Sequence, residues 1–333
     1  MDGLLVVDKS AGLTSHDVVA RMRRVLREKA IGHTGTLDPM ATGVLLLVLG
    51  KATRLARFLT ASDKSYDARV RLGFATDTAD AMGRAVGPVS EWPMPSREAI
   101  DAALEQFRGT FMQQPPAFSA KKIDGQRSYK LARARAADAR LQPSRYDGPD
   151  LPDQPAPPDP PALPAPASVT THRLEIVSIE ADTLALSVVC SAGFYVRSLA
   201  HDLGARLGTG GHLTALRRTT TGGFGIDRAI TLDAAERDPE RAAAAVVPLT
   251  GILRQLPAVV LTAEGVTRAT HGRDIDPRDS ALSEPSALSP EPSSSLSLSP
   301  EPFVRLLDSH GNLVAIAQPA GAGGLLHPSV VLV

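Results

Sequence analysis

Residues 32–43 of this 333-residue chain have the sequence GHTGTLDPMATG, and the apolar run Val44–Leu49 follows directly. A continuous apolar run next to a glycine-rich segment predicts a fully buried strand that is entered through a tight loop. Asp38 lies in this loop immediately before Pro39, whose ring disfavours the helical conformation for the residue before it. The backbone therefore restrains the carboxylate. From these facts alone, a surface turn and a preorganised catalytic carboxylate explain Asp38 equally well.

Periodic patterns on either side of the loop predict both strands and helices. Strands repeat apolar residues at every second position, and amphipathic helices at every third or fourth. Strands are expected at Leu4–Val7, Tyr66–Leu72 and Leu184–Cys190. Helices are expected after an N-cap at Thr14 or Ser15, after an N-cap at Ser96, and over Val196–Leu207.

Two segments of biased composition interrupt these patterns. Residues 142–167 are rich in proline, and residues 276–302 are rich in serine, proline, leucine and glutamate. Neither has hydrophobic periodicity, so both are expected to be insertions rather than packed structure. Short strand-like pieces flank the second one. We therefore expect two domains, 1–250 and a small β-rich domain over 251–333.

The composition favours a globular, cytoplasmic protein. Hydrophobic residues make up 43% of the chain, and the formal net charge is zero. The apolar runs are far shorter than the roughly 18 residues of a membrane-spanning helix. The N-terminus does not have the pattern of a signal peptide, and the single cysteine, Cys190, fits a reducing compartment.

Several kinds of catalytic site are absent from the sequence. There is no P-loop, no Gly-x-Gly-x-x-Gly and no Gly-x-Ser-x-Gly motif. The eight histidines are scattered, and there is no second cysteine for a zinc site. We therefore expect neither a metal nor a cofactor, and any chemistry must use carboxylates, tyrosines and arginines.

Three further residues are candidates for a functional site that includes Asp38. Tyr66 lies on the apolar face of its strand, where a core tyrosine is the simplest explanation and a stacking platform for a planar ring is the functional one. Tyr195 and Arg197 flank the turn into a helix. An arginine at a helix start, where the dipole favours anions, calls for an anionic partner. Asp38 is one candidate for that partner.

Basic residues gather in clusters although the net charge is zero. Three of them are residues 21–29, residues 121–140 and the pair Arg217 and Arg218. Each cluster alone is explained by a solvated helix face, and together they leave binding to a polyanion open.

Four blocks of this sequence resemble the TruB family of tRNA pseudouridine synthases. They are GHTGTLDPMATGVLLLVLGKATRL, KSYDARVRLGFATDTADAMG, QQPPAFSAKKIDGQRSYKLAR and GFYVRSLAHDLGARLGTGGHLTALRR. The resemblance covers most of residues 1–135 and 169–228, in the order of the family. One departure is Asp8-Lys9-Ser10, where the family usually has Asp-Lys-Pro.

The resemblance implies an α+β fold with a mixed, mainly antiparallel central sheet flanked by helices, and a small PUA-like C-terminal domain. It implies that 1–250 is the catalytic domain. In it, Asp38 is the catalytic aspartate, Tyr66 the base-stacking tyrosine and Arg197 the partner of Asp38. Substrate binding is expected to involve His33, Tyr195, Leu216, Lys9 and Lys121.

The implied substrate is the flipped-out uridine at position 55, in the TΨC loop of tRNA. The region 121–135 resembles an insertion that clamps this loop, and a monomer that acts alone is expected. Two alternatives stay open. One is an RNA-binding or tRNA-folding module in which isomerisation is secondary, and the other is an enzyme that works within a guide-RNA particle.

Overall fold

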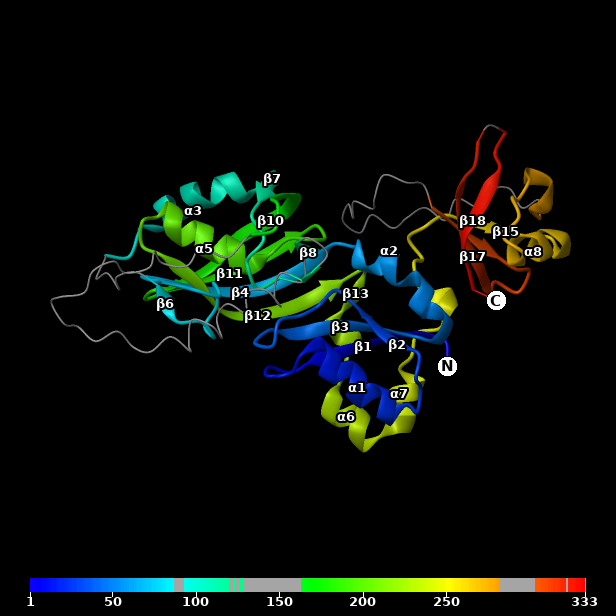
Figure 1. Cartoon of the computed structure of the whole chain (residues 1–333), viewed down its shortest axis with the longest axis horizontal. Helices are drawn as coiled ribbons and strands as arrows, with labels where there is room; N and C mark the ends of the chain where they lie inside the picture. The colour runs from blue at the N-terminus through cyan, green and yellow to red at the C-terminus, as the bar shows by residue number, and fades with distance from the viewer. Residues whose placement is uncertain are drawn as a thin grey trace, which may run out of the picture. The chain divides into compact units, whose positions relative to one another are not determined.

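The computed structural model describes residues 1–86, 93–119, 122–123, 126–127, 163–281, 303–321 and 323–332 (Figure 1). The chain divides into two compact units. Unit 1 comprises Met1–Asp67 and Leu216–Val333, and unit 2 comprises Ala68–Ala215. Both boundaries fall inside strands, β4 and β12, so the polypeptide passes between the units without a linker. The predicted division at residue 250 stays a prediction.

The sheet of unit 1 is built on the predicted buried strand. Strand β3 (Thr42–Leu49) pairs antiparallel with β1 (Gly3–Lys9) along the whole length of β1. Every residue from Val44 to Leu49 is at most 1% exposed, which confirms the predicted strand. Around this pair, β2 (Ile31–Thr34) is antiparallel to β3, β12 (Gly211–Thr221) is parallel to β3, β14 (Ile230–Thr231) is parallel to β1, and β13 (Phe224–Gly225) pairs with β12. The sheet is therefore mixed.

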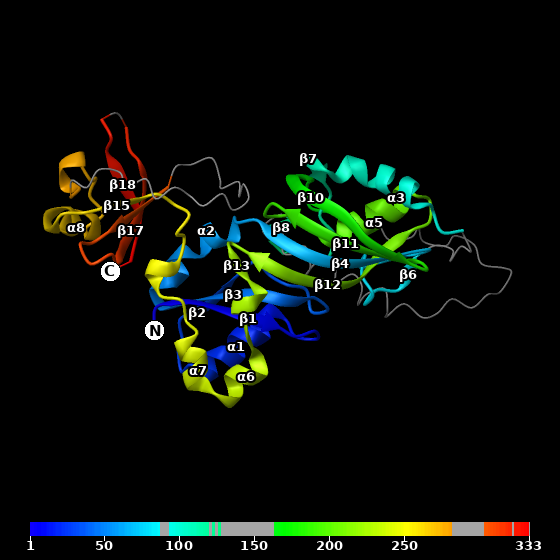
Figure 2. The same cartoon turned by 180° about the vertical axis from the view of Figure 1, so that it is seen from behind.

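Helices cover one face of this sheet. Helix α1 (Ser15–Val25) begins after Thr14, which is the N-cap as predicted and forms a capping box with Asp17. Figures 1 and 2 show α1 with α6 (Leu232–Arg237) and α7 (Pro239–Ala244) on the same side of β1 and β3. The remaining helical turns of unit 1 outside the C-terminal sheet are η1 (Gly50–Leu55), α2 (Ala56–Thr60), η3 (Ile226–Arg228) and η4 (Leu249–Gly251).

The strands of unit 2 follow the order β4-β11-β10-β7 within the ten-stranded sheet. These strands are β4 (Lys64–Leu72), β11 (Thr183–Cys190), β10 (Ala167–Glu180) and β7 (Gly109–Gln113). Strand β4 alternates buried and exposed residues as predicted, and Cys190 is fully buried. Helices α3 (Arg97–Leu104) and α5 (Val196–Arg206) lie together beside β10 and β11 (Figures 1 and 2). The short elements are η2 (Glu105–Phe107), the hairpin β5 (Ala75–Thr76) with β6 (Ala85–Val86), and the hairpin β8 (Lys122–Ile123) with β9 (Gln126–Arg127).

The C-terminal part of unit 1 is a small sheet, as predicted. Its order is β15-β16-β17-β18, with β15 and β16 parallel and the other pairs antiparallel. The elements are β15 (Ala258–Val260), α8 (Ala263–Thr270), η5 (Pro277–Asp279), β16 (Val304–Leu307), β17 (Leu313–Pro319) and β18 (Leu326–Val331). Phe303 packs edge-on against Phe58 of α2, with 4.8 Å between ring centroids, so the small sheet shares apolar contacts with the rest of unit 1.

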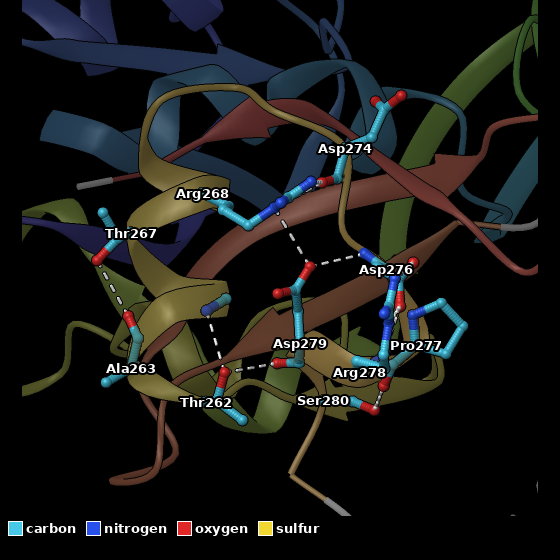
Figure 3. A network of polar contacts seen from close by, with 11 residues as sticks. Thr262, Ala263, Thr267, Arg268, Asp274, Asp276, Pro277, Arg278, Asp279 and Ser280 are labelled. Atoms are coloured by element: carbon cyan, nitrogen blue, oxygen red, sulfur yellow. Dashed lines mark hydrogen bonds and ion pairs between the residues drawn. The ribbon is translucent and has the colours of Figure 1, made fainter.

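A polar network closes the turn that follows α8 (Figure 3). The carboxylate of Asp279 accepts a hydrogen bond from the backbone N of Asp276 at 2.8 Å and pairs with Nε of Arg268 at 3.3 Å. The Thr262 hydroxyl, at the N-cap of α8, donates to the carbonyl O of Asp279 at 3.1 Å. The composition of the sequence predicts that the second insertion starts at residue 276. The structure instead has an ordered turn there, and the described chain continues to residue 281.

The described part of the chain contains no helix that combines the length and the apolar character needed to cross a membrane.

Candidate active site

The loop that carries Asp38 is held by groups from other parts of unit 1. The Ser15 hydroxyl accepts a hydrogen bond from the backbone N of Leu37 at 3.0 Å and donates to the carbonyl O of the same residue at 3.2 Å. The backbone N of Gly12 donates to the carbonyl O of Pro39 at 2.8 Å. The residues immediately before and after Asp38 are thus both anchored, which restricts where its carboxylate can lie.

Lys9 adds a buried positive charge to this region. Its side chain is completely buried, and its ammonium group donates to the carbonyl oxygens of Ser10, Leu13 and Pro39 at 2.9, 2.8 and 3.3 Å. Burial lowers the pKa of Lys9 to about 8, and the nearby charge of Asp38 opposes that change. Because three backbone carbonyls use its donors, Lys9 helps to hold the loop. Its expected contact with the substrate stays a prediction.

Gly43 shows why the end of the loop needs glycine. Its φ is +98°, and a Cβ atom at this position would lie 2.2 Å from the carbonyl O of Arg218 on the neighbouring strand β12. Any side chain would push the two strands apart. Gly43 therefore allows the loop to enter the buried strand β3 in close contact with β12.

Three more predicted site residues belong to unit 1. Tyr66 on β4 and Leu216 on β12 are each 8% exposed, so both are largely buried. His33 on β2 is partly exposed and packs edge-on against His16 of α1, with 5.2 Å between ring centroids. Unit 1 therefore contains Asp38 together with Tyr66, Leu216 and His33, three residues expected to act on the RNA.

Arg197 lies in unit 2, in the first turn of α5, and is 4% exposed. Its Nη1 donates to the carbonyl O of Thr78 at 3.1 Å, and its Nη2 donates to the carbonyl O of Phe118 at 2.7 Å. Its Nε lies 3.9 Å from the carboxylate of Asp80. The position of this arginine at a helix start predicts an anionic partner. Asp80 is such a partner, and the sequence patterns did not identify it. The pairing of Arg197 with Asp38 stays a prediction.

Asp80 also organises the turn around itself. Its Oδ1 accepts hydrogen bonds from the Thr78 hydroxyl at 2.7 Å and from the backbone N of Met82 at 3.0 Å. The Thr76 hydroxyl donates to the carbonyl O of Asp80 at 2.7 Å. Asp80 thus couples the conformation of the turn to the position of Arg197. The available signal was the polar run Asp77-Thr78-Ala79-Asp80, whose short side chains favour turns.

Gln113 fixes the backbone of Tyr195. Its side-chain amide accepts from the backbone N of Tyr195 at 2.8 Å and donates to the carbonyl O of the same residue at 3.0 Å. Gln113 is 2% exposed, so these bonds are sheltered from water. Next to it, the carbonyl O of Gln114 accepts from the Ser198 hydroxyl at 2.7 Å. The sequence signal for this supporting role is the pair Gln113-Gln114, two polar residues at the end of strand β7.

Lys121, the last predicted substrate-binding residue, lies outside the described residues. Of the expected clamp over 121–135, the structure describes only the backbone of the β8–β9 hairpin. Within the described ranges, no group of three or more histidine, cysteine, aspartate or glutamate residues is placed to hold a metal ion.

The fold is similar to that of solved pseudouridine synthase structures. A structure titled as an H/ACA RNP bound to a substrate RNA containing 2'-deoxyuridine matches with a TM-score of 0.66 at 22% identity, covering 99% of this chain and 85% of that one. A Cbf5-Nop10-Gar1 complex matches with the same TM-score and coverage at 25% identity. The chain therefore has a pseudouridine synthase fold, with a mixed sheet, flanking helices and a small β-rich C-terminal part.

Sequence comparisons narrow this class to one family. The family described as TruB family pseudouridylate synthase (N terminal domain) matches residues 23–145, and the tRNA pseudouridylate synthase B C-terminal domain matches residues 197–254. A protein of Solibacter usitatus named tRNA pseudouridine synthase B is 38% identical over the full length of both chains. A protein of the same name from Aromatoleum aromaticum is 42% identical over 79% of this chain and 77% of its own length. This chain belongs to the TruB family of pseudouridine synthases.

Proposed function

We propose that this protein isomerises uridine to pseudouridine at position 55, in the TΨC loop of tRNA. The observation that carries the proposal is the loop of Asp38, whose two neighbours Leu37 and Pro39 are anchored by Ser15, Gly12 and Lys9. A carboxylate on a fixed loop is suited to act at one atom of a bound nucleotide. The family to which the chain belongs supports the same reaction.

The reaction needs no reactant other than the RNA. The bond between N1 and C1′ breaks, the uracil turns, a bond forms between C5 and C1′, and the proton leaves C5 while N1 gains one. We assign Asp38 to the nucleophile of this rearrangement and Tyr66 to stacking on the uracil and proton transfer. Arg197 is assigned to pairing with Asp38, which would keep the carboxylate ionised.

The remaining predicted residues are assigned to substrate binding. Tyr195 and Leu216 line the uracil pocket in this proposal, and His33 contacts the flipped-out nucleotides. Lys121 is assigned to the clamp on the RNA loop. Extracting the base from its stack costs a few kcal/mol, and contacts of basic residues with phosphates offset this cost.

The proposed partner is the TΨC stem-loop of tRNA, bound by a monomer in the cytoplasm. The sequence supports the choice of an RNA partner through its basic clusters. Binding that rests on phosphate contacts should weaken as salt increases.

The test is incubation of the purified protein with unmodified tRNA, followed by mapping of pseudouridine by carbodiimide labelling and primer extension. The expected result is one new pseudouridine at position 55. If tRNA binds and no pseudouridine forms, the proposal is wrong and the RNA-binding or tRNA-folding alternative is favoured. Pseudouridine at another position would retain the enzyme class and contradict the assigned substrate.

A further inference from the structure

Arg218 is a buried cation on strand β12. Its side chain is 1% exposed. Its Nε donates to the carbonyl O of Val44 at 2.7 Å, and its Nη2 donates to the carbonyl O of Gly35 at 2.9 Å. In the described part of the chain, no carboxylate lies within ion-pair distance of its guanidinium. Removing a charged group from water costs several kcal/mol when no counter-ion is near, so filling space is a poor explanation for an arginine here.

The neighbouring Arg217 has the usual environment of a charged side chain, with partial exposure to solvent and a carboxylate partner. The side chain of Arg217 is 41% exposed and forms an ion pair with Asp8 at 2.8 Å. Successive residues of a strand point to opposite faces, so Arg217 and Arg218 meet different surroundings. The exposed arginine has a carboxylate partner, whereas the buried one binds backbone carbonyls alone.

The two carbonyls that Arg218 binds lie on either side of Asp38 in the sequence. Gly35 precedes the aspartate by three residues, and Val44 is the third residue of strand β3. The loop also touches the backbone of Arg218, because a Cβ at Gly43 would meet its carbonyl O. One side chain therefore connects the start of the loop with the strand where the loop ends.

A second buried cation lies close by. Asp38 and Arg218 both act electrostatically on Lys9, the carboxylate favouring its charge and the guanidinium opposing it. The ammonium of Lys9 donates to the carbonyl O of Pro39, directly after Asp38. Lys9 and Arg218 thus bring two buried cations to the backbone of the loop, at Pro39 and Gly35 on the two sides of the aspartate.

We propose that Arg218 is a positioning residue of the isomerisation, acting through the loop that carries Asp38. By fixing Gly35 to Val44 it holds the carboxylate where the nucleotide is attacked, and it does not touch the RNA. This inference rests on the proposed function, because it assumes that Asp38 is the reacting group. A displacement of about 1 Å at a reacting group can slow an enzyme about a hundredfold.

The test is Arg218→Lys, which keeps the charge but cannot reproduce the forked hydrogen bonds to both carbonyls. The matched control is Arg305→Lys. Arg305 lies on β16, donates from Nε to the carbonyl O of Leu256 at 3.0 Å and from Nη2 to that of Arg254 at 3.3 Å, and so has the same donor chemistry away from the loop. Three quantities are measured for each variant: thermal unfolding, the Kd for a TΨC stem-loop, and the single-turnover rate at saturating RNA.

We expect Arg218→Lys to lower the single-turnover rate about tenfold or more and to leave Kd within about threefold. Arg305→Lys should leave both values within about twofold. An Arg218→Lys protein with reduced thermal stability but an unchanged rate would show a purely structural role and overturn the inference. If the wild type forms no pseudouridine, the proposed function fails and the inference fails with it.

A second variant serves if Arg218→Lys does not fold. Gly35→Ala leaves Arg218 in place and strains the backbone whose carbonyl Arg218 binds, because the φ of Gly35 is +76°, a conformation that residues with a Cβ rarely adopt. A folded Gly35→Ala protein with a reduced rate and an unchanged Kd supports the inference. A rate equal to that of the wild type would contradict it.

Discussion

Asp38-Pro39 and Asp276-Pro277 are the same dipeptide in two differently built turns. In the second turn the aspartate holds its own loop. The carboxylate of Asp276 accepts from the backbone N of Arg278 at 2.9 Å, and the turn is completed by a capping box with Asp279. The loop of Asp38 is instead held through the backbone of Leu37 and Pro39, by Ser15, Gly12 and Lys9 together with Arg218 further along the loop.

A structural aspartate and the proposed catalytic one thus differ in how their turns are supported. A carboxylate that caps a turn is used up by the backbone it stabilises. In the loop of Asp38, hydrogen bonds between its backbone and Ser15, Gly12, Lys9 and Arg218 supply support that comes from outside the dipeptide. The dipeptide itself does not reveal this difference, because Ser15 and Arg218 are distant from Asp38 in the sequence.

The largest expected effect separates the two aspartates directly. Asp38→Ala removes the proposed nucleophile and should lower pseudouridine formation by about a thousandfold or more. Asp276→Ala removes the cap of its turn and the pairing with Arg278, so activity should stay within about twofold while stability falls. End-point mapping of pseudouridine and thermal unfolding measure the two effects. Equal losses of activity in both variants would remove the distinction.

The next prediction concerns the hydroxyl groups that hold the two turns. Ser15→Ala removes both hydrogen bonds to Leu37 and should lower the single-turnover rate about tenfold. Thr262→Ala removes the hydroxyl that binds Asp279 and should lower stability by about 1 kcal/mol without changing the rate. A rate measured on the folded fraction of each variant gives the comparison. An unchanged rate in Ser15→Ala would show that the loop does not depend on this contact.

Of the two turns, the loop of Asp38 is the one that alkaline pH should weaken, because Lys9 loses its charge there. As the pH rises through the lowered pKa of Lys9, about 8, the amine loses its charge and keeps two donors for three carbonyls. Asp38, Arg218 and Asp17 are the charged groups that act on it. We expect the rate of the wild type, relative to that of Lys9→Met, to fall between pH 7 and 9. Parallel pH profiles for the two proteins would exclude this role.

Alkaline pH should change the stability of the protein in the opposite direction to its reaction rate. Between pH 8 and the ordinary pKa of 10.5, the unfolded chain binds more protons at Lys9 than the native protein does, so the free energy of unfolding rises with pH relative to Lys9→Met.

Acidic pH should reduce the stabilising contribution of the turn at Asp276. The hydrogen bond from the Arg278 side chain lowers the pKa of Asp276 from 3.8 to about 2. The stabilising contribution of Asp276 is therefore present above pH 3.8 and is lost as the pH falls towards 2. Denaturant titrations of the wild type and Asp276→Asn at pH 5 and pH 2.5 should show a stability difference that narrows in acid. A constant difference would mean that the charge of Asp276 is not involved.

The smallest effect is expected from shortening the second insertion. Replacing residues 282–302 by a short glycine-serine linker should leave activity and stability near those of the wild type. Replacing 276–302 instead also removes Asp276 and Asp279, so stability should fall through the loss of the network around Arg268 (Figure 3). Loss of activity in a folded 282–302 replacement would show that the insertion has a function of its own.

Local sequence patterns predicted much of the fold. The apolar run Val44–Leu49, the alternation in β4 and the N-caps Thr14 and Ser96 are all properties of neighbouring residues, and all are confirmed. The turn at Pro277–Asp279 was missed because serine and proline dominate the surrounding composition and hide a short capping box.

The supporting residues of the site could not be predicted in the same way. Ser15 forms hydrogen bonds with a residue 22 positions away, and Gln113 with one 82 positions away. Asp80 forms an ion pair with Arg197, 117 positions away. No periodicity in the sequence encodes such distant contacts. Arg218 was visible only as one charge in a basic pair. Its burial follows from the packing of β12 against β3, which is a property of the folded sheet.

The most direct test of the account is the isosteric variant Asp38→Asn, which removes the charge and leaves the externally held loop intact. A TΨC stem-loop with tritium at C5 of the target uridine reports the reaction, because the C5 proton is lost when C5 binds C1′. We predict a single-turnover rate of tritium release lower by about a thousandfold or more, with the Kd for the stem-loop within about tenfold of that of the wild type. Release within about tenfold of the wild-type rate would contradict the assignment of Asp38 as the reacting group.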